Sequence, residues 1–237
     1  MKLAILVTNT DVSKFSESRP KDGEKFTLLI QSVRPSWLCS IFSVKDNVFP
    51  KELNKFDGFI ITGSPASVHD ISPWISKLMN LIREIHKANK PMFGSCFGHQ
   101  AIALALGGSV GQNPSGWSHG LIENKMTAVL PWAHVPPTYN LYGSHIEQVT
   151  KLPIIAKPVV TSEGCEVAGY IIERNVFTTQ HHPEMSHEFI TDLVEECAQY
   201  VGFDATSKAR KSLEKYADGK MFSELIVLFF EWSLKQN

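Results

Sequence analysis

The segment Gly94-Ser95-Cys96-Phe97-Gly98 places a cysteine between two glycines, with one residue on either side. A cysteine thiolate is a strong nucleophile, and this spacing is typical of a sharp strand-to-helix turn that exposes a nucleophile. The glycines let backbone pass close to a strained residue, and the start of a helix favours the thiolate. A buried, inert cysteine is the alternative. The apolar strand pattern before Cys96 and the helical pattern after it favour the nucleophile.

A second candidate segment, Gln180-His181-His182-Pro183-Glu184, follows a short apolar run. A cysteine nucleophile needs an imidazole to exchange protons with it, and the imidazole needs a third group to fix its tautomer. Glu184 lies two residues after His182 and is placed to hydrogen-bond that ring. Two alternatives are a solvated histidine-rich turn and a metal site formed by His181, His182, Glu184 and His187. No second ligand cluster accompanies these residues, so we expect no metal.

A nucleophilic attack on a carbonyl also requires two donors for the developing oxyanion. The backbone N–H of Phe97 follows the nucleophile and is one candidate. The loop over residues 62–67 leaves an earlier strand, and Gly63 or Ser64 could supply the other. A plain strand-ending turn is the alternative for this loop.

Apolar runs alternate with helical patterns through residue 106, which predicts a mainly parallel central sheet with helices on both faces. From Gly108 to Thr179 short strands follow one another, separated by prolines and glycines. This change predicts a small antiparallel extension of the sheet. The expected strands are residues 2–8, 37–44, 56–62, 91–95, 122–130, 139–142, 154–160, 166–172 and 176–179; the expected helices are 23–33, 75–88 and 101–106, with helical segments after Pro183 and over 205–237.

Composition narrows the functional classes. The 237 residues carry a formal net charge of -1, without a block of like charge, so we expect no nucleic-acid or membrane surface. No apolar run approaches the roughly 20 residues that cross a bilayer. The four cysteines form no CxxC pair, and with no export signal we expect reduced thiols and a cytoplasmic location. We expect one α/β domain over residues 1–200, with residues 201–237 as its C-terminal helical extension.

Taken together, these segments resemble the class I, triad-type glutamine amidotransferases over about residues 1–200. The match rests on four ordered motifs: G-x-C-x-G-x-Q at 94–100, H-P-E at 182–184, G-G-P-x-S-V at 63–68, and S-H-x-D-x-V at 144–149, the last typical of the GMP synthase branch. The resemblance implies a flavodoxin-like α/β fold and a cysteine amidohydrolase that needs no cofactor. It also favours His182 over His181.

Carried over to matching positions, the family's triad falls on Cys96 as nucleophile, His182 as base and Glu184 as its orienting group. The backbones of Gly63 and Phe97 would offer the oxyanion donors, with Ser64 beside them. Gln100, Ser144 and His145 would surround the bound γ-glutamyl group. The residues alone leave two alternatives: Gln100 as a surface helix residue, and His145 as a hydrogen-bonded loop histidine.

The sequence departs from the family pattern at several positions. Ser64 replaces a glycine, Glu147 replaces an aspartate, Ser118 follows Trp117 where relatives often carry an acid, and Gln180-His181 replaces Gln-Phe. These changes leave the predicted triad intact and bear on substrate specificity.

The resemblance implies hydrolysis of the γ-carboxamide of glutamine, or of a γ-glutamyl amide, through a thioester on Cys96. No phosphate-binding loop is present, so ammonia for synthesis would pass to a separate synthetase subunit. A free-standing γ-glutamyl peptidase is the alternative. A non-catalytic binding or regulatory protein on the same fold is the second alternative.

Overall fold

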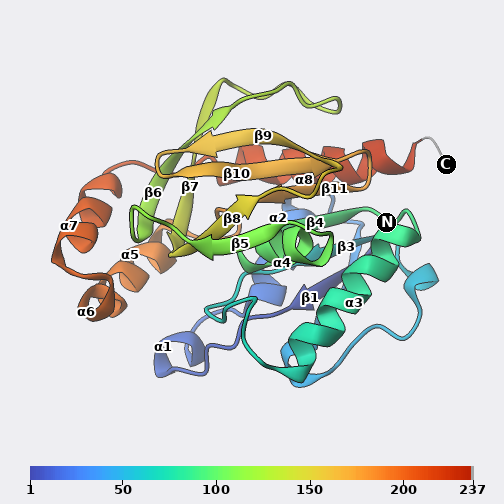
Figure 1. The fold of residues 1–237 in the computed structure, drawn as a ribbon, viewed down its shortest axis with the longest axis horizontal. Helices are drawn as coiled ribbons and strands as arrows, with labels where there is room; N and C mark the ends of the chain where they lie inside the picture. Colours follow the sequence, from blue (N-terminus) through green and yellow to red (C-terminus); the bar gives the residue numbers. More distant parts are fainter. Residues whose placement is uncertain (236–237) are drawn as a thin grey trace.

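A nine-stranded sheet forms the centre of the computed structural model, which describes residues 1–235 (Figure 1). The strand order is β2-β1-β3-β4-β11-β10-β9-β6-β7. The first five are mutually parallel and the last four pair antiparallel, so the predicted fold class is confirmed. The parallel strands are β1 (Lys2–Val7), β2 (Leu38–Ser43), β3 (Gly58–Ile61), β4 (Met92–Ser95) and β11 (Val176–Thr179); the antiparallel strands are β6 (Ser118–Met126), β7 (Thr138–His145), β9 (Ala156–Ser162) and β10 (Cys165–Ile172).

Helices cover both faces of the parallel strands, as the sequence predicts. Successive side chains of a strand point to opposite faces, so Leu6 of β1 joins one core cluster, while Leu3 and Ile5 join the other. The first cluster packs under α3 (Pro73–Lys87) and α4 (Phe97–Ala105). The second packs under α2 (Asp22–Val33) and α8 (Gly219–Leu234).

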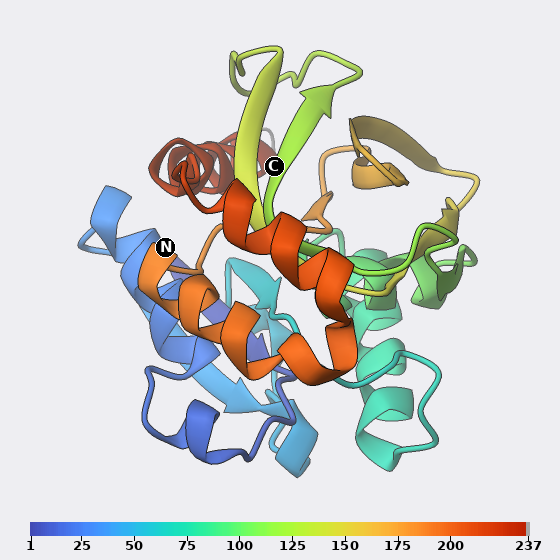
Figure 2. The same cartoon turned by 90° about the vertical axis from the view of Figure 1, so that its left-hand side faces the viewer.

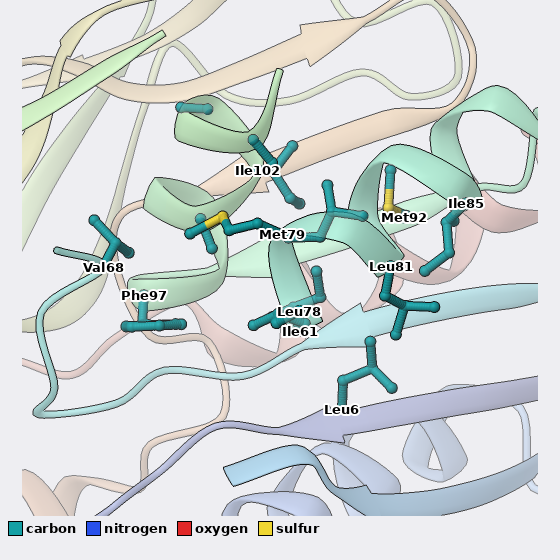
Figure 3. Close-up of a cluster of buried hydrophobic side chains, with 14 of the residues drawn as sticks. Leu6, Ile61, Val68, Leu78, Met79, Leu81, Ile85, Met92, Phe97 and Ile102 are labelled. Carbon is teal, nitrogen blue, oxygen red and sulfur yellow. The ribbon is translucent and has the colours of Figure 1, made fainter. Parts of the chain in front are cut away.

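The cluster under α3 and α4 fixes the helix that follows the candidate nucleophile (Figure 3). Leu78 of α3 lies beside Ile61 of β3, and Met79 of α3 and Phe97 and Ile102 of α4 belong to the same buried cluster. The spacing of apolar residues along α3 gives this helix one apolar face and one solvent face. The start of α4 is therefore held at the carboxyl end of β4.

The antiparallel half differs in detail from the sequence prediction. The strand expected over 122–130 begins four residues earlier, because β6 pairs with β7 from Ser118 opposite His145 to Lys125 opposite Thr138. Beyond Met126 the chain turns, and Leu130 forms only an isolated bridge with Ala133. A separate two-stranded sheet of β5 (Ser109–Gln112) and β8 (Glu147–Lys151) was not predicted. Its strands are short, and each finds its partner far along the chain.

From His187 onward the described chain is helical apart from short connections. The helices are α5 (His187–Glu196), α6 (Ala198–Val201), α7 (Phe203–Ser212) and α8, and short helices earlier in the chain are α1 (Lys14–Glu17), η1 (Val44–Asp46) and η2 (Leu53–Lys55). Figure 2 shows α5 and α7, in orange, crossing the side of the molecule that also carries α1. The α8 helix packs beside α2, and its phenylalanines enter the core of the sheet. No helix within residues 1–235 is long and apolar enough to cross a membrane.

Candidate active site

Cys96 lies at the junction of β4 and α4 in a strained backbone conformation, with φ of 48° and ψ of −106°. A positive φ is uncommon outside glycine and marks a sharp turn. The turn is held on both sides: the Cys96 N–H donates to the Thr179 carbonyl at 2.9 Å, and the Gln100 N–H donates to the Cys96 carbonyl at 3.0 Å. The strand–turn–helix geometry predicted for this segment is present.

The two glycines of the motif are required by close packing of backbone. A Cβ at Gly94 would lie 2.7 Å from the carbonyl carbon of Gly98. A Cβ at Gly98 would overlap the carbonyl of Ile61 on the neighbouring strand. The Gly98 N–H donates to the Thr62 carbonyl at 3.1 Å, which ties the turn to the end of β3. Side chains at either glycine would push α4 away from the sheet.

His182 follows β11 and is oriented by Glu184. The Nδ1 atom of His182 donates to Oε1 of Glu184 across 2.6 Å, and both side chains are buried. The backbone N–H of His182 donates to the Tyr142 carbonyl at 2.8 Å. This bond fixes the backbone of His182 against β7. The tautomer with its proton on Nδ1 leaves Nε2 free to exchange a proton.

Cys96 and His182 meet beside Gly63. A Cβ at Gly63 would lie 2.7 Å from Cε1 of His182 and 3.5 Å from Cβ of Cys96. Burial alone lowers the pKa of His182, but the electrostatic interactions with Glu184 and Cys96 and the hydrogen bonds to both side chains raise that pKa well above its ordinary value. This geometry therefore favours the protonated ring, an imidazolium beside the Glu184 carboxylate.

The loop after β3 is fixed against the first strand. The Gly63 carbonyl accepts a hydrogen bond from the Thr8 hydroxyl at 2.9 Å. Since the peptide is planar and trans, the Ser64 N–H points away from Thr8. At its other end the loop is held by Ser67, whose hydroxyl donates to Glu147 at 3.0 Å.

A buried glutamine that the sequence did not single out contacts the candidate nucleophile. The Nε2 amide of Gln180 donates to the Cys96 sulfur at 3.7 Å. Gln100 donates in turn to Oε1 of Gln180 at 3.3 Å and to the Glu147 carbonyl at 2.8 Å. Gln100 is buried rather than on the helix surface. The signals for Gln180 were its position directly before the two histidines and its match to the glutamine of the family's Gln-Phe pair.

Eight of the nine sequence-predicted site residues line one cavity of about 480 Å³. The ninth, Phe97, turns its side chain into the core, where its ring lies 5.6 Å from that of Trp74. Only its backbone N–H remains available to the site. The eight lining residues are Gly63, Ser64, Cys96, Gln100, Ser144, His145, His182 and Glu184.

His145 is buried in the wall of this cavity. Its Nδ1 donates to the Glu147 carbonyl at 3.1 Å, and burial lowers its pKa to about 4. The ring is therefore neutral at physiological pH, and its buried Nε2 has no hydrogen-bond partner among the described residues. Such a nitrogen accepts a hydrogen bond and does not donate one.

Two histidines of the alternative metal site have hydrogen-bond partners within the protein. The Nδ1 of His181 lies 2.8 Å from Oδ1 of Asn124, and the Nδ1 of His187 lies 2.9 Å from the Tyr142 hydroxyl. Within residues 1–235 no three His, Cys, Asp or Glu side chains converge as a metal site requires.

The cavity is lined by acidic side chains. No lysine or arginine of the described chain lines it, whereas five acidic residues do: Asp11, Asp22, Glu147, Glu184 and Glu196. A ligand with an ammonium group suits such a wall better than an anion does.

Comparisons with known proteins bear on the family and the fold. Residues 31–196 match the family model "Glutamine amidotransferase class-I". Gamma-glutamyl peptidase 4 of Arabidopsis thaliana is 34% identical over 203 residues, which are 80% of each chain. The glutamine-hydrolyzing GMP synthase of Petrotoga mobilis is 31% identical over 75% of this chain, but only 34% of that protein is covered. The crystal structure of a glutamine amidotransferase from Methylobacillus flagellatus covers 99% of this chain and 95% of its own, with a TM-score of 0.78 and 20% identity.

Proposed function

This chain belongs to the class I glutamine amidotransferase family, and we propose that it hydrolyses the γ-amide of glutamine or of a γ-glutamyl compound through a thioester on Cys96. The observation that carries the proposal is the meeting of Cys96, His182 and Glu184 in one cavity, with the cysteine on a strained turn. Each group has the chemistry that its role requires.

In the first half of the reaction the Cys96 thiolate attacks the γ-carbonyl carbon. The backbone N–H groups of Phe97 and of Gly63 or Ser64 stabilise the oxyanion. His182, held as an imidazolium by Glu184, gives its proton to the nitrogen as the carbon–nitrogen bond breaks. The amine leaves, and a γ-glutamyl thioester remains on Cys96.

In the second half water attacks the thioester. His182 is now neutral and accepts a proton from the water through Nε2, while Glu184 keeps the ring in the required tautomer. Collapse of the second tetrahedral intermediate releases glutamate and restores the thiolate–imidazolium pair. No cofactor takes part in either half of this scheme.

The γ-glutamyl group is assigned to the part of the cavity lined by Gln100, Ser144 and His145. The acidic residues that line the cavity suit the α-ammonium of such a substrate.

A free-standing γ-glutamyl peptidase is the second candidate, and one observation favours it. The similar proteins include four γ-glutamyl peptidases of Arabidopsis thaliana, among them gamma-glutamyl peptidase 4. An amidotransferase would instead deliver ammonia to a separate synthetase subunit. A cytoplasmic location, expected from the sequence, is part of either proposal.

The test compares L-glutamine with γ-glutamyl dipeptides as substrates of the purified protein. Release of ammonia from glutamine supports the first candidate, and turnover of peptides alone supports the second. Cys96→Ser is expected to abolish turnover, whereas Cys39→Ser, a half-buried cysteine on the edge strand β2, serves as the matched control. No turnover, together with no labelling of Cys96 by a glutamine-like diazoketone, would leave a non-catalytic binding protein as the remaining interpretation.

A further inference from the structure

One wall of the candidate active-site cavity combines aromatic rings with carboxylates. Glu196 ends α5, Tyr200 lies on α6 and Asp11 follows β1, and all three line the cavity that holds Cys96. Trp117 lines the same cavity, and its ring centroid lies 6.5 Å from that of Tyr200. We call Asp11, Trp117, Glu196 and Tyr200 the outer wall.

Both carboxylates of the outer wall lie close to the same two side chains. The Tyr200 hydroxyl lies 3.2 Å from the Cys197 sulfur. This hydrogen bond, burial and the charges of Cys197, Glu196 and Asp11 raise the pKa of Tyr200 to about 12. Burial and the same two carboxylates raise the pKa of the Cys197 thiol. Asp11 and Glu196 therefore come together around Tyr200, although they are far apart in the sequence.

Neither carboxylate of the outer wall has a cationic partner. Within residues 1–235 no lysine, arginine or histidine forms an ion pair with Asp11 or Glu196, whereas the neighbouring Glu195 pairs with Arg210. Glu196 also lies in the last turn of α5, where the helix dipole favours a cation, and this turn carries no basic residue. A bound ammonium group would relieve this concentration of negative charge.

The cavity as a whole holds more negative charge than glutamine can neutralise. Of its five acidic residues, Glu184 pairs with His182 and Asp22 pairs with Lys25. The carboxylates that remain without a cation are those of Asp11, Glu147 and Glu196. Glutamine carries one ammonium and one carboxylate, so it brings no net charge. A substrate with a second ammonium group on its leaving amine brings a net positive charge and suits this cavity better.

The two ends of such a substrate have separate surroundings. The backbone of Glu147 accepts a hydrogen bond from Gln100, so Glu147 belongs to the part of the cavity assigned to the γ-glutamyl group. The outer wall comes from other elements, which leaves its carboxylates for the amine. The faces of Trp117 and Tyr200 can contact both the methylene groups and the ammonium of an alkyl diamine.

We propose that the outer wall is the subsite for the leaving amine, and that the preferred substrates are γ-glutamyl amides of α,ω-diamines, whose leaving amine carries a second ammonium group. The inference rests on the proposed function and specifies its substrate class. The terminal ammonium binds between the carboxylates of Asp11 and Glu196. When the carbon–nitrogen bond breaks, the nitrogen takes the proton of His182 and the free diamine departs. Water then converts the thioester to glutamate.

The test compares γ-glutamylputrescine with γ-glutamylpentylamide, which has a methyl group in place of the terminal ammonium. Matched pairs with one methylene group fewer and one more are included, because the distance from Cys96 to the outer wall selects the chain length. We expect the wild-type protein to prefer the diamine in the best-fitting pair by about tenfold in kcat/KM, the combined effect of an exposed ion pair and a cation–π contact. The γ-glutamyl amide of 5-aminopentanoate, with a carboxylate at that end, should be the poorest substrate.

Variants of the outer wall test the assignment directly. Glu196→Gln should reduce the preference for the diamine about fivefold, the upper end for one exposed ion pair. Trp117→Leu should reduce the preference as well, because it removes the aromatic face. Glu188→Gln, at an exposed position of the same helix outside the cavity, should leave the preference at its wild-type value.

The inference and the proposed function fail in distinguishable ways. The inference is wrong, while the chemistry stands, if the diamine and alkyl amides are hydrolysed equally well at every chain length, or if L-glutamine alone is hydrolysed. It is also wrong if Glu196→Gln changes the preference no more than Glu188→Gln does. If none of these substrates is hydrolysed and a glutamine-like diazoketone fails to label Cys96, the proposed function itself is wrong. The diazoketone separates the two cases, because it has no leaving amine and needs no outer wall.

Discussion

The side-chain amide of Gln180 donates to the sulfur of Cys96, and this contact adds a fourth group to the predicted triad. The orientation of the amide is fixed, because Oε1 of Gln180 accepts from Gln100 and so turns Nε2 toward the sulfur. A donor at a buried sulfur stabilises the thiolate more than the thiol. Gln180 is therefore a positioning and charge-stabilising residue in the proposed site.

This contact predicts that a variant that reverses it makes Cys96 less reactive. Gln180→Glu replaces the donor with an acceptor of nearly the same shape, so the sulfur loses its donor and faces a carboxylate. We expect the rate of iodoacetamide alkylation of Cys96 at neutral pH to fall below that of the wild-type protein. The measurement is this alkylation rate in each variant. Gln31→Glu on α2, whose amide contacts the Trp37 carbonyl, is the control, and an unchanged rate in Gln180→Glu would contradict the assigned role.

The hydrogen bond between Glu184 and His182 predicts that removal of the Glu184 charge lowers activity and shifts the pH dependence of activity. Glu184→Gln keeps the side-chain shape but removes the charge that raises the pKa of His182. The imidazolium then deprotonates at lower pH, so the alkaline decline of kcat/KM should move to lower pH. We expect kcat/KM at neutral pH to fall about 10²-fold or more, the usual worth of acid–base catalysis.

The matched control for this prediction is Glu188→Gln, at an exposed position in the first turn of α5. It should keep the wild-type rate and pH profile. Equal activity of Glu184→Gln and the wild-type protein on either substrate class would remove Glu184 from the proposed triad.

The sequence predicted those parts of the site whose signals are local. The glycines and the apolar strand lie within a few residues of Cys96, and Glu184 lies two residues after His182. Gln180 and the burial of Gln100 could not be found in this way. The side chain of Gln100 is buried against the backbone of Glu147, to which it donates a hydrogen bond. The position of Glu147 depends in turn on the pairing of β5 with β8. Such pairing joins segments about 40 residues apart, and their short strands carry no clear alternation.

A side chain at Gly63 is predicted to lower activity, because it would crowd the His182 ring. Its missing Cβ would lie 2.7 Å from the His182 ring, so Gly63→Ala must displace the imidazole from Cys96. A displacement on the order of 1 Å costs about 10²-fold in rate, and we expect such a loss in kcat without a large change in thermal stability. Gly111→Ala is the control, since its Cβ would meet Thr150 at an ordinary 3.4 Å. Full activity of Gly63→Ala would show that the His182 ring does not need this position.

The assignment of residues 201–237 to the same domain predicts that α8 is required for stability. Phe230 of α8 is fully buried, and a Cβ at Gly58 on β3 would lie 2.5 Å from its ring. Phe230→Ala should therefore destabilise the whole protein by about 3–5 kcal/mol in urea unfolding, as a single transition. Leu228→Ala, a partly exposed position of the same helix, should cost much less. A separate early transition for α8 would instead make residues 201–237 an independent appendage.

Buried neutral histidines predict that the protein loses stability as the pH falls below about 6.5. Burial lowers the pKa of His99 to about 3 and those of His119 and His145 to about 4. Below the ordinary pKa of about 6.5 the unfolded chain binds protons that the folded chain does not, and the free energy of unfolding decreases. Each such group contributes a slope of up to about 1.4 kcal/mol per pH unit between these limits.

His182 does not offset this loss in the same pH range. Its folded pKa is raised, so the stability it contributes is complete below the unfolded pKa and is lost only as the pH rises through the folded value. Urea unfolding at intervals between pH 5 and 8 should therefore show a falling free energy of unfolding on the acidic side. His119→Gln should reduce the acidic slope by about one group's share, about 1.4 kcal/mol per pH unit, whatever its effect on stability at pH 8. His134→Gln changes an exposed histidine and should leave the slope as it is; equal slopes in all three proteins would mean that His119 is already protonated in the folded state.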